Sequence, residues 1–255
     1  MKRLVLWVLV LMLLMTTALA EGDAAAVQAK GRLIVGVTDF APMDYRDASG
    51  AWVGFDADLA AAFAESLGVQ VELTEIDWDN KVLELQSGTI DCVWNGMTLT
   101  DEVLASMSCS VPYLNNAQVV VLPAGKAEAV KTAADLSGLV LAVEAGSAGE
   151  AQADTLGLAK TAVASQADAL MEVAAGTSDG AVIDALMAAA MVGEGTGYPN
   201  LTYRLKLSSE QYGVGFRQGS DLTDRLNAFL ADMTANGRLQ ALAEQYKVQA
   251  ALIVE

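Results

Sequence analysis

Short apolar segments that predict buried β-strands alternate with amphipathic segments that predict α-helices along most of this chain. One set of such units lies before Pro112 and a second set follows it. The expected strands are Leu33–Val37, Val69–Glu75, Ile90–Trp94, Ala117–Leu122, Leu139–Val143 and Ala181–Ile183. Strands connected through helices favour a parallel sheet covered by helices. We therefore expect an α/β protein with two lobes, which is more economical than a single sheet of so many strands.

The first 20 residues have the pattern of a secretory signal. Two basic residues precede an apolar run at 4–15, and the Ala-Leu-Ala sequence at 18–20 is typical of a cleavage site. An uncleaved anchor is the weaker alternative, because the apolar run is short for a membrane span. The residue after Ala20 is Glu21, not the cysteine that a lipid anchor requires. We expect cleavage after Ala20 and a periplasmic or extracellular protein.

The composition excludes several classes of function. The chain has 32 acidic and 15 basic residues, which give a formal net charge of −17, and it has no histidine. Such a surface repels nucleic acid and anionic lipid headgroups. Without histidine a serine–histidine triad is impossible, and two cysteines alone make a zinc site unexpected. We therefore expect no catalytic residues, no metal and no cofactor, and we expect nucleic acid not to be a partner.

Cys92 and Cys109 are the two cysteines of the chain. In an oxidising compartment an even number of cysteines favours a disulfide, and this pair would close a short loop. In the chain-entropy model such a bond stabilises the folded state by roughly 3 kcal/mol. The alternative is two buried thiols, since Cys92 lies within an apolar strand. The disulfide is the favoured of the two.

The segment Ile90–Leu104, with the sequence IDCVWNGMTLTDEVL, contains a strand end that is followed closely by a helix start. The expected strand ends at Trp94, and the helix begins at Thr100. Backbone groups in such a place are unpaired and point outward, which is why α/β proteins bind small molecules there. The sequence therefore predicts a binding loop between the two elements, formed by Asn95, Gly96, Met97 and Thr98.

Seven motifs follow one another along nearly the whole chain after residue 30. They are LIVGVTDFAPMDY (33–45), WVGFDADLAAAFAESLG (52–68), EIDWDNKVLELQSGTIDC (75–92), NGMTLTDE (95–102), LAVEAGSAGE (141–150), GAVID (180–184) and EQYGVGF (210–216). Each is loose alone, but in this order they resemble the family 3 solute-binding proteins, the polar amino-acid receptors of ABC importers. The resemblance implies the two-lobed periplasmic-binding-protein fold of type II.

The resemblance also implies that the lobes close on a ligand like a hinge. We expect the two crossing segments near Tyr113–Ala117 and Ser209–Tyr212. The receptor is expected to be a monomer that delivers its ligand to an inner-membrane ABC permease. The expected division of the chain is a signal at 1–20, an N-terminal tether at 21–30, lobe 1 at 31–113, lobe 2 at 117–209 and a return to lobe 1 at 212–255.

Two aromatic residues, Phe40 and Trp78, stand at positions that flank the ligand side chain in the family that the sequence resembles. An aromatic ring in such a place sandwiches an aliphatic stem or stacks on a cation. The alternative for each residue is packing in the core. For Trp78, between Asp77 and Asp79, a place in a pocket or at the surface is favoured.

Backbone groups and one carboxylate complete the site that the resemblance implies. Gly96 and Thr98 match positions that bind the α-amino and carboxylate groups of the ligand. Asp184 matches the carboxylate that pairs with the α-ammonium, although an aspartate there is often only a helix cap. The N–H groups of the loop at 146–148 would receive the carboxylate at a helix start. The full expected site is Asp39, Phe40, Trp78, Lys81, Asn95, Gly96, Met97, Thr98, Glu144, Gly146, Ser147, Ala148 and Asp184.

One departure from the family pattern concerns the ligand carboxylate. The pattern runs roughly G-x-T-x-T-x-E-R, and Val103 stands in the place of its arginine. Lys81 is a candidate substitute; alternatively, helix N-termini and the Thr98 hydroxyl hold the carboxylate, or the ligand lacks one. The acids expected around the cleft are Asp39, Asp44, Asp77, Asp79, Glu144 and Asp184. Although several of these acids can point to solvent instead, their charge favours a cationic ligand.

The sequence thus predicts a receptor for an amino acid or a related amine-containing solute, and two other functions stay open. Some proteins with this fold are cyclohexadienyl dehydratases, in which a buried acid donates a proton; Glu144 or Asp184 would have that role here. The missing arginine counts against a substrate that carries carboxylates. The other alternative is a sensor that docks on a receptor ectodomain in its closed, ligand-bound form.

Overall fold

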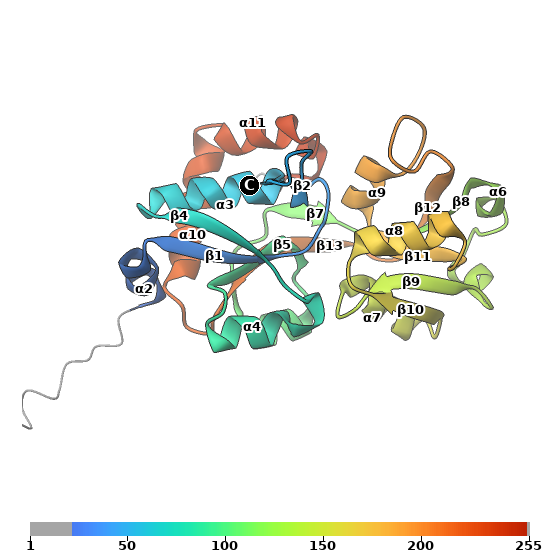
Figure 1. Ribbon diagram of the computed structural model, residues 1–255, viewed down its shortest axis with the longest axis horizontal. Helices are drawn as coiled ribbons and strands as arrows, with labels where there is room; N and C mark the ends of the chain where they lie inside the picture. Colours follow the sequence, from blue (N-terminus) through green and yellow to red (C-terminus); the bar gives the residue numbers. More distant parts are fainter. Residues whose placement is uncertain (1–21, 254–255) are drawn as a thin grey trace, which may run out of the picture.

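The computed structural model describes residues 22–253, which form two α/β lobes that lie next to each other (Figure 1). The expected signal at residues 1–20 lies outside the described residues. Among residues 22–253, no helix combines the length and the apolar character needed to cross a membrane.

Lobe 1 is built on a six-stranded sheet. In this sheet β1 pairs in parallel with β4 and β5, whereas β13 pairs antiparallel with β5, β6 and β7. The strands are β1 Arg32–Val37, β4 Gln70–Glu75, β5 Cys92–Thr98, β6 Ser108–Cys109, β7 Leu114–Asn116 and β13 Glu210–Phe216. All residues of β5 except the last are buried, which is typical of a strand covered by helices on both faces.

Helices cover this sheet on both faces, with α3 and α11 on one side and α4 on the other (Figure 1). The helices of lobe 1 are α2 Asp23–Lys30, α3 Phe55–Ser66, α4 Lys81–Ser87, α5 Asp101–Ser106, α10 Leu222–Ala235 and α11 Arg238–Gln245. The short strands β2 (Tyr45–Arg46) and β3 (Trp52–Val53) form a separate antiparallel pair. Leu59 and Phe63 of α3 are fully buried. The Phe63 ring lies 6.2 Å from that of Trp94 and 5.4 Å from that of Phe229, so it joins β5 to α10.

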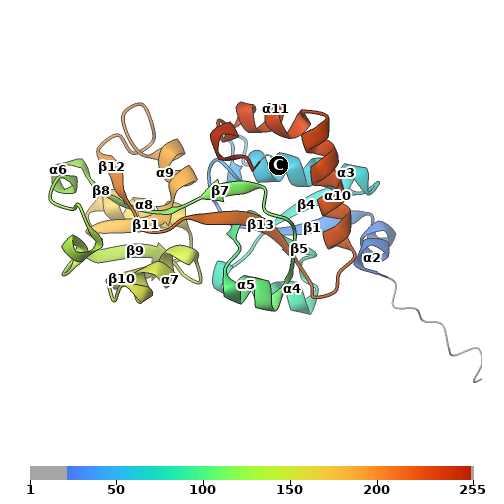
Figure 2. The ribbon, with the colours of Figure 1, turned by 180° about the vertical axis from the view of Figure 1, so that it is seen from behind.

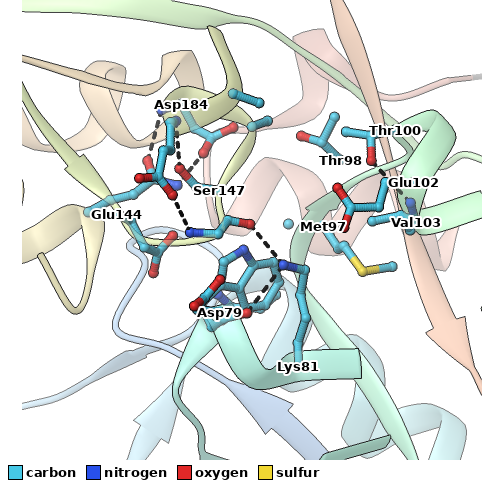
Figure 3. Close-up of a pocket in the computed structure, with 18 of the residues that line it drawn as sticks. Asp79, Lys81, Met97, Thr98, Thr100, Glu102, Val103, Glu144, Ser147 and Asp184 are labelled. Atoms are coloured by element: carbon cyan, nitrogen blue, oxygen red, sulfur yellow. Dashed lines mark hydrogen bonds between the residues drawn. The ribbon is translucent and has the colours of Figure 1, made fainter. Parts of the chain in front are cut away.

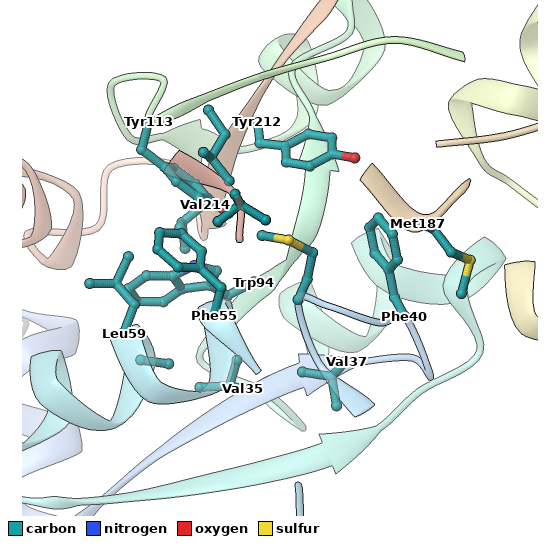
Figure 4. Close-up of a cluster of buried hydrophobic side chains, with 14 of the residues drawn as sticks. Val35, Val37, Phe40, Phe55, Leu59, Trp94, Tyr113, Met187, Tyr212 and Val214 are labelled. Carbon is teal, nitrogen blue, oxygen red and sulfur yellow. The ribbon is translucent and has the colours of Figure 1, made fainter. Parts of the chain in front are cut away.

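The core of lobe 1 continues toward lobe 2 (Figure 4). Phe55 of α3 lies next to Trp94 of β5, and Phe40 and Tyr212 lie at the side of the cluster that faces Met187 of lobe 2. All five side chains are at most 1 % exposed. Full burial of each contributes roughly 1.5–3 kcal/mol, so this cluster holds the inner ends of β5 and β13 in place.

Asp56 lies near the start of α3 but does not cap this helix. The N-cap of α3 is Gly54, whose φ of 140° and close approach to the Met43 carbonyl leave no room for a Cβ. Asp56 is fully buried inside the first turn, where its carboxyl group accepts hydrogen bonds from Gly96 N (2.7 Å) and from the Tyr113 hydroxyl (2.8 Å). Burial raises the pKa of Asp56 to about 7. This carboxyl group therefore ties α3 to the strand end at Gly96.

Lobe 2 is built on a five-stranded sheet in the order β10-β9-β11-β8-β12. The strands β9, β10 and β11 are parallel, and β8 is antiparallel to both of its neighbours. Ser165 caps α8, with its hydroxyl accepting from Asp168 N. The elements are β8 Gln118–Pro123, α6 Ala124–Ala127, β9 Val140–Glu144, α7 Ala148–Thr155, β10 Ala159–Val163, α8 Gln166–Ala175, β11 Gly180–Asp184, α9 Ala185–Met191 and β12 Leu201–Lys206.

The chain crosses between the lobes twice, and the two crossings run side by side (Figure 2). The first lies at Ala117 between β7 and β8, and the second lies at 207–209 between β12 and β13. Glu210, Gln211 and Tyr212 of β13 pair with residues 114–116 of β7. That these paired crossings act as the hinge stays a prediction.

Residues 23–30, expected to be part of a tether, form the helix α2 docked on lobe 1. Ala24 and Val27 are fully buried. The Ala24 N–H donates to Asp221 Oδ1 (2.9 Å), and Lys30 forms an ion pair with the buried carboxylate of Asp91 at 2.6 Å. Alanine-rich sequence has a high helix propensity, and its small side chains pack closely enough to be buried.

The expected disulfide is absent, and Cys92 and Cys109 are both free thiols. In the sheet, Cys92 pairs with Phe216 and Cys109 pairs with Gly215, so β13 lies between them. Two strand spacings separate the cysteines by about 10 Å, beyond the roughly 7 Å limit on the Cα separation of a disulfide. Neighbouring residues of β13 also face opposite sides of the sheet, which directs the two thiols apart.

We therefore expect the protein purified without reductant to contain two free thiols per chain. Thiol titration in denaturant should count both, and addition of a reductant should leave the melting temperature unchanged. Burial raises the pKa values of both thiols, so they should react slowly in the folded protein. A melting temperature that falls on reduction would contradict this arrangement.

Candidate functional site

A cavity of about 450 Å³ lies between the two lobes (Figure 3). All but two of the residues expected from the sequence line it. These lining residues are Trp78, Lys81, Asn95, Gly96, Met97, Thr98, Glu144, Gly146, Ser147, Ala148 and Asp184. They come from the ends of β5, β9 and β11 and from the starts of α4 and α7. The carboxyl ends of the strands of both lobes therefore face this space, as expected for an α/β ligand site.

Asp39 and Phe40 are the two expected site residues that do not line the cavity. Asp39 is exposed, and Phe40 is only 1 % exposed. The Phe40 ring packs edge-on against Tyr212 with 6.3 Å between ring centroids. It also fills the space beside Gly96, where a Cβ would come within 2.4 Å of Phe40 Cε1. Core packing, the alternative considered for Phe40, is therefore its role in this structure.

The strand end of lobe 1 uses some of its polar groups within the protein. Gly96 has a φ of 56°, and its N–H donates to Asp56, so this N–H is not free for a ligand. The Thr98 hydroxyl donates to Glu210 Oε1 (3.0 Å). Thr100 Oγ1 accepts a hydrogen bond from Val103 N (3.2 Å) and caps α5. The Gly96 N–H and the Thr98 hydroxyl are thus already engaged within the protein.

Lys81 connects the two lobes across the cavity. Its ammonium group donates to the carbonyl oxygens of Gly146 (2.8 Å) and Trp78 (3.2 Å) and lies 5.0 Å from the centroid of the Trp78 ring. Burial lowers the pKa of Lys81, while the charges of Glu144, Glu102 and Asp79 oppose that shift. The hydrogen bond to Gly146 holds lobe 2 against the start of α4.

The loop before α7 forms the opposite wall. Ser147 caps the helix, with its hydroxyl accepting from Glu150 N (3.1 Å). The Gly146 N–H donates to Glu150 Oε2 (2.8 Å), so the protein's own carboxylate occupies this donor. Lys160 forms ion pairs with Glu150 (2.7 Å) and Asp154 (2.6 Å) and holds the Glu150 side chain in place.

Asp184 ends β11 at the base of the cavity and is 4 % exposed. Its carboxyl group accepts hydrogen bonds from the Tyr212 hydroxyl (2.7 Å), Gln118 Nε2 (3.0 Å) and the side-chain amides of Asn116 and Gln166. Burial, followed by the nearby charge of Glu210, raises the pKa of Asp184 well above its usual value. It does not cap α9 with its side chain, so the helix-cap alternative does not hold.

Glu144 lies beside Asp184 and is 2 % exposed. It accepts a hydrogen bond from the hydroxyl of Thr38 in lobe 1 (3.1 Å), and Asn95 Nδ2 donates to the same hydroxyl (2.8 Å). Burial raises the pKa of Glu144 to about 8, against the opposing effects of Thr38, Gln166 and Lys81. The cavity therefore has two buried carboxyl groups at its base whose pKa values are raised.

Residues 33–249 match the family model of the bacterial extracellular solute-binding proteins, family 3. The chain belongs to this family. It is 27% identical to the arginine-binding extracellular protein ArtP of Bacillus subtilis over 90% of this chain and 91% of that protein. It is 28% identical to the L-cystine-binding protein TcyJ of Escherichia coli K12, over 89% of this chain and 86% of that protein.

Solved structures confirm the predicted two-lobed fold of this solute-binding protein. A mutant of ArgBP from T. maritima superposes with a TM-score of 0.83 at 32% sequence identity, covering 88% of this chain and 98% of that one. A more limited similarity, 29% identity over 83 residues, links the chain to the cyclohexadienyl dehydratase of Pseudomonas aeruginosa. That match covers 32% of this chain and 31% of the enzyme.

The cavity of this family member is strongly acidic. Of the acids expected around the cleft, Asp39, Asp44 and Asp77 do not line it. The carboxyl groups among the lining residues are those of Asp79, Asp101, Glu102, Glu144, Glu150, Asp154 and Asp184. Lys81 is the one basic side chain among the lining residues in the described part of the chain. Val103, in the place of the family's arginine, lines the cavity as well and is 6 % exposed.

Several lining residues were not among those expected from the sequence. Gln166 is the most consequential, because it donates to Asp184 through its amide and accepts from Asp184 N through its carbonyl (2.8 Å). Its position at the start of α8, directly after the cap Ser165, was an available signal. Glu150 and Asp154 lie on α7 one and two turns beyond Gly146, so helical spacing would have placed them near the loop. The remaining additions are Val82, Thr100, Asp101, Glu102, Val103 and Ala151, while Asp79 lines the cavity as one of the acids expected around the cleft.

Proposed function

We propose that this protein binds an amino acid or a related amine-containing solute between its lobes and delivers it to an ABC permease of the inner membrane. The observation that carries the proposal is the cavity whose two walls come from different lobes, with Asp184 at its base. Its volume of about 450 Å³ lies within the range of roughly 300–1,000 Å³ that is usual for small-molecule sites. Family membership, together with the arginine- and cystine-binding relatives, supports this class of ligand.

Hinge closure is supported by hydrogen bonds that join the lobes directly. Thr38 contacts Glu144, and Lys81 contacts Gly146, across the cavity. Opening the lobes would break both contacts, while the paired strands β7 and β13 would stay together. A ligand that touches both walls makes more contacts in the closed form than in the open form. This difference in affinity shifts the population toward the closed form.

Each wall supplies a different part of the recognition. Asp184 becomes the carboxylate partner of a ligand ammonium group. The Trp78 ring faces the cavity beside Lys81 and covers the aliphatic part of the ligand. The signal is cleaved after Ala20, and the mature receptor works outside the cytoplasm as a monomer. Uptake of the ligand, measured in a strain that lacks this protein, distinguishes delivery to a permease from a sensor role.

A ligand screen by thermal shift tests this function. Amino acids, their amides and polyamines are added in turn, and a true ligand should raise the melting temperature in a concentration-dependent way. At 100 times Kd, binding stabilises the folded state by about 2.7 kcal/mol. Calorimetry should then show one site per chain. If no compound of these classes shifts the melting temperature at millimolar concentration, the proposal is wrong.

We also propose that binding is not followed by chemical turnover. The buried, protonated carboxyl group of Glu144 is the feature that would favour a dehydratase, because it is a candidate proton donor. A cyclohexadienyl substrate carries carboxylates, which meet an acidic wall with Val103 in place of an arginine. Incubation with prephenate or arogenate should therefore yield no product. Steady formation of product that Glu144→Gln abolishes would establish an enzyme instead.

A further inference from the structure

The wall of the cavity around Val103 offers little to hold an anion. Val103 presents a buried apolar side chain there, and the side chains of Asp101 and Glu102 belong to the same wall (Figure 3). The Thr98 hydroxyl already donates its proton to Glu210. A ligand carboxylate placed at this wall would meet two acidic side chains, and the one further hydroxyl there, that of Thr100, is held by its oxygen at the start of α5.

The wall formed by lobe 2 is also unsuited to an anion. At the loop before α7, Glu150 already accepts from the Gly146 N–H. The three charged side chains of Glu150, Asp154 and Lys160 together carry one net negative charge. Asp79 lies against Gly146, where a Cβ would come within 2.7 Å of Asp79 Cα. An incoming carboxylate would compete with Glu150 for its donor and be repelled by it.

The one ammonium group among the described lining residues is held away from this task. Lys81 uses two of its three protons on the carbonyl oxygens of Trp78 and Gly146, which fix it at the contact between the lobes. Seven carboxyl groups line the cavity with it, and two of them, Glu150 and Asp154, are paired with Lys160. At the base of the cavity, Glu144 and Asp184 accept hydrogen bonds from neutral donors. These donors satisfy the two carboxyl groups but bring no positive charge to the base of the cavity.

We infer that the ligand is an organic cation without a free carboxylate group, namely an alkyl diamine, a guanidinoalkyl amine or an amino-acid amide. This inference rests on the proposed function and specifies the ligand of the same site. The positive groups of such a ligand would lie on the carboxyl groups of Asp184 and Glu144. Its other end would meet Val103 and the acids of α5, where a second positive charge or a neutral amide is favoured over a carboxylate.

Matched ligand pairs that differ in the carboxylate test the inference. Calorimetry with the mature protein at pH 7.5 compares agmatine and argininamide with L-arginine, and cadaverine with L-lysine. In every set that binds, we expect the carboxylate-free member to bind at least tenfold more tightly. If the free amino acid binds equally well or better, the inference is wrong and the proposed function stands.

Two further outcomes of the same experiment separate the inference from the function on which it rests. If none of these compounds binds but a neutral or acidic amino acid does, the inference is again wrong while the receptor function stands. If no amino acid or amine binds at all, both are wrong.

Val103→Arg should reverse the preference, because a guanidinium on this wall is a bidentate partner for a carboxylate. We expect the ratio of affinities within each pair to move at least tenfold toward the free amino acid. Leu104→Arg is the matched control, since Leu104 is 50% exposed and is not among the lining residues. An unchanged ratio in a folded Val103→Arg protein would overturn the inference.

A milder substitution provides the test if Val103→Arg does not fold. Glu102 is exposed and lines the cavity, so Glu102→Gln removes one negative charge without disturbing the core. It should weaken binding of the carboxylate-free cation about two- to fivefold and strengthen binding of the amino acid. Glu65→Gln, an exposed change outside the cavity with the same effect on net charge, should do neither. Equal effects of the two substitutions would count against the inference.

Discussion

Replacing Asp184 by asparagine is expected to weaken ligand binding at least 100-fold while the protein remains folded. The carboxyl group of Asp184 is buried at the base of the cavity, and its pKa is raised well above the usual value by burial and then by the charge of Glu210. A charge on this group is therefore disfavoured unless a cation lies beside it. A cationic ligand supplies the missing charge and allows the group to ionise, which an asparagine cannot do.

The expected magnitude follows from the interaction between two unit charges. At a separation of 4 Å and an effective dielectric constant of 20, their attraction is about 4 kcal/mol. Each 1.4 kcal/mol corresponds to about a tenfold change in affinity, so most of this attraction must be retained to reach a 100-fold effect. The low exposure of Asp184 makes that expectation reasonable, because little water enters to screen the pair.

Asparagine is preferred to alanine because the site contains many donors. Tyr212, Gln118, Asn116 and Gln166 all donate to Asp184. Asn116 and Gln118 also donate to Glu210, so alanine would remove above all the acceptor of the Tyr212 hydroxyl and of the Gln166 amide. Each such loss costs roughly 1–3 kcal/mol. Asparagine has the shape of the protonated aspartate and keeps an oxygen acceptor in place.

Calorimetry with the best ligand of the screen measures the effect. Asp179→Asn is the matched control, since Asp179 immediately precedes the other end of β11, is only half-buried and does not line the cavity. It should change the affinity less than twofold. If Asp184→Asn binds within threefold of the natural protein, Asp184 is not the partner of the ligand cation.

The position of the cavity between the lobes was predictable because strand ends are encoded locally. The apolar runs that end at Trp94, Val143 and Ile183 are each followed by polar or glycine residues. In the structure the ends of β5, β9 and β11 face one cavity, as the carboxyl ends of parallel strands do in α/β sites. Residues immediately after the strands, such as Glu144 and Asp184, were therefore correctly expected near one another.

Features that depend on distant parts of the chain were not predictable in this way. Phe40 follows a strand end as the binding residues do, but Gly96, 56 residues later, leaves room for its ring in the core. Cys92 and Cys109 are close in sequence, yet β13 is inserted between their strands from more than 100 residues away. Asp56 has the appearance of a helix cap, and its partners Gly96 and Tyr113 are supplied by β5 and by the approach to the first crossing. Local patterns carry no information about such partners.

Stability of the ligand-free protein is expected to fall as the pH rises from about 5 to 8. Burial raises the pKa of Asp56 to about 7 and that of Glu144 to about 8, and it raises the pKa values of Asp44 and Asp184 well above their usual values. In the unfolded chain these groups lose their protons near pH 4. Over this window the folded state therefore binds more protons than the unfolded state, so the free energy of unfolding decreases with pH.

The slope and the position of the maximum follow from the same groups. Each group contributes about 1.4 kcal/mol per pH unit between its unfolded and folded pKa values, so Asp56 and Glu144 together give about 2.7 kcal/mol per unit between pH 5 and 7. Hydrogen bonds lower the pKa values of Asp47 and Asp135. The pKa of Glu150 is also lowered, by its contact with Lys160 and by the hydrogen bond from Gly146 N. These groups reduce stability below about pH 4. Maximum stability is therefore expected near pH 4–5, more acidic than in most proteins.

Urea denaturation at half-unit steps from pH 4 to 8.5 measures this dependence, and Glu144→Gln identifies one of its sources. Glutamine cannot ionise, so the slope between pH 5 and 8 should fall by about one proton, or about 1.4 kcal/mol per pH unit. The charged groups that act on Glu144 are Lys81 and Asp168, and neither is changed by this substitution. Glu65→Gln, at an exposed position, should leave the slope as it is. A stability that rises between pH 5 and 7 would show that these carboxyl groups are ionised in the folded protein. The protein itself would then supply the compensating positive charge that we assign to the ligand.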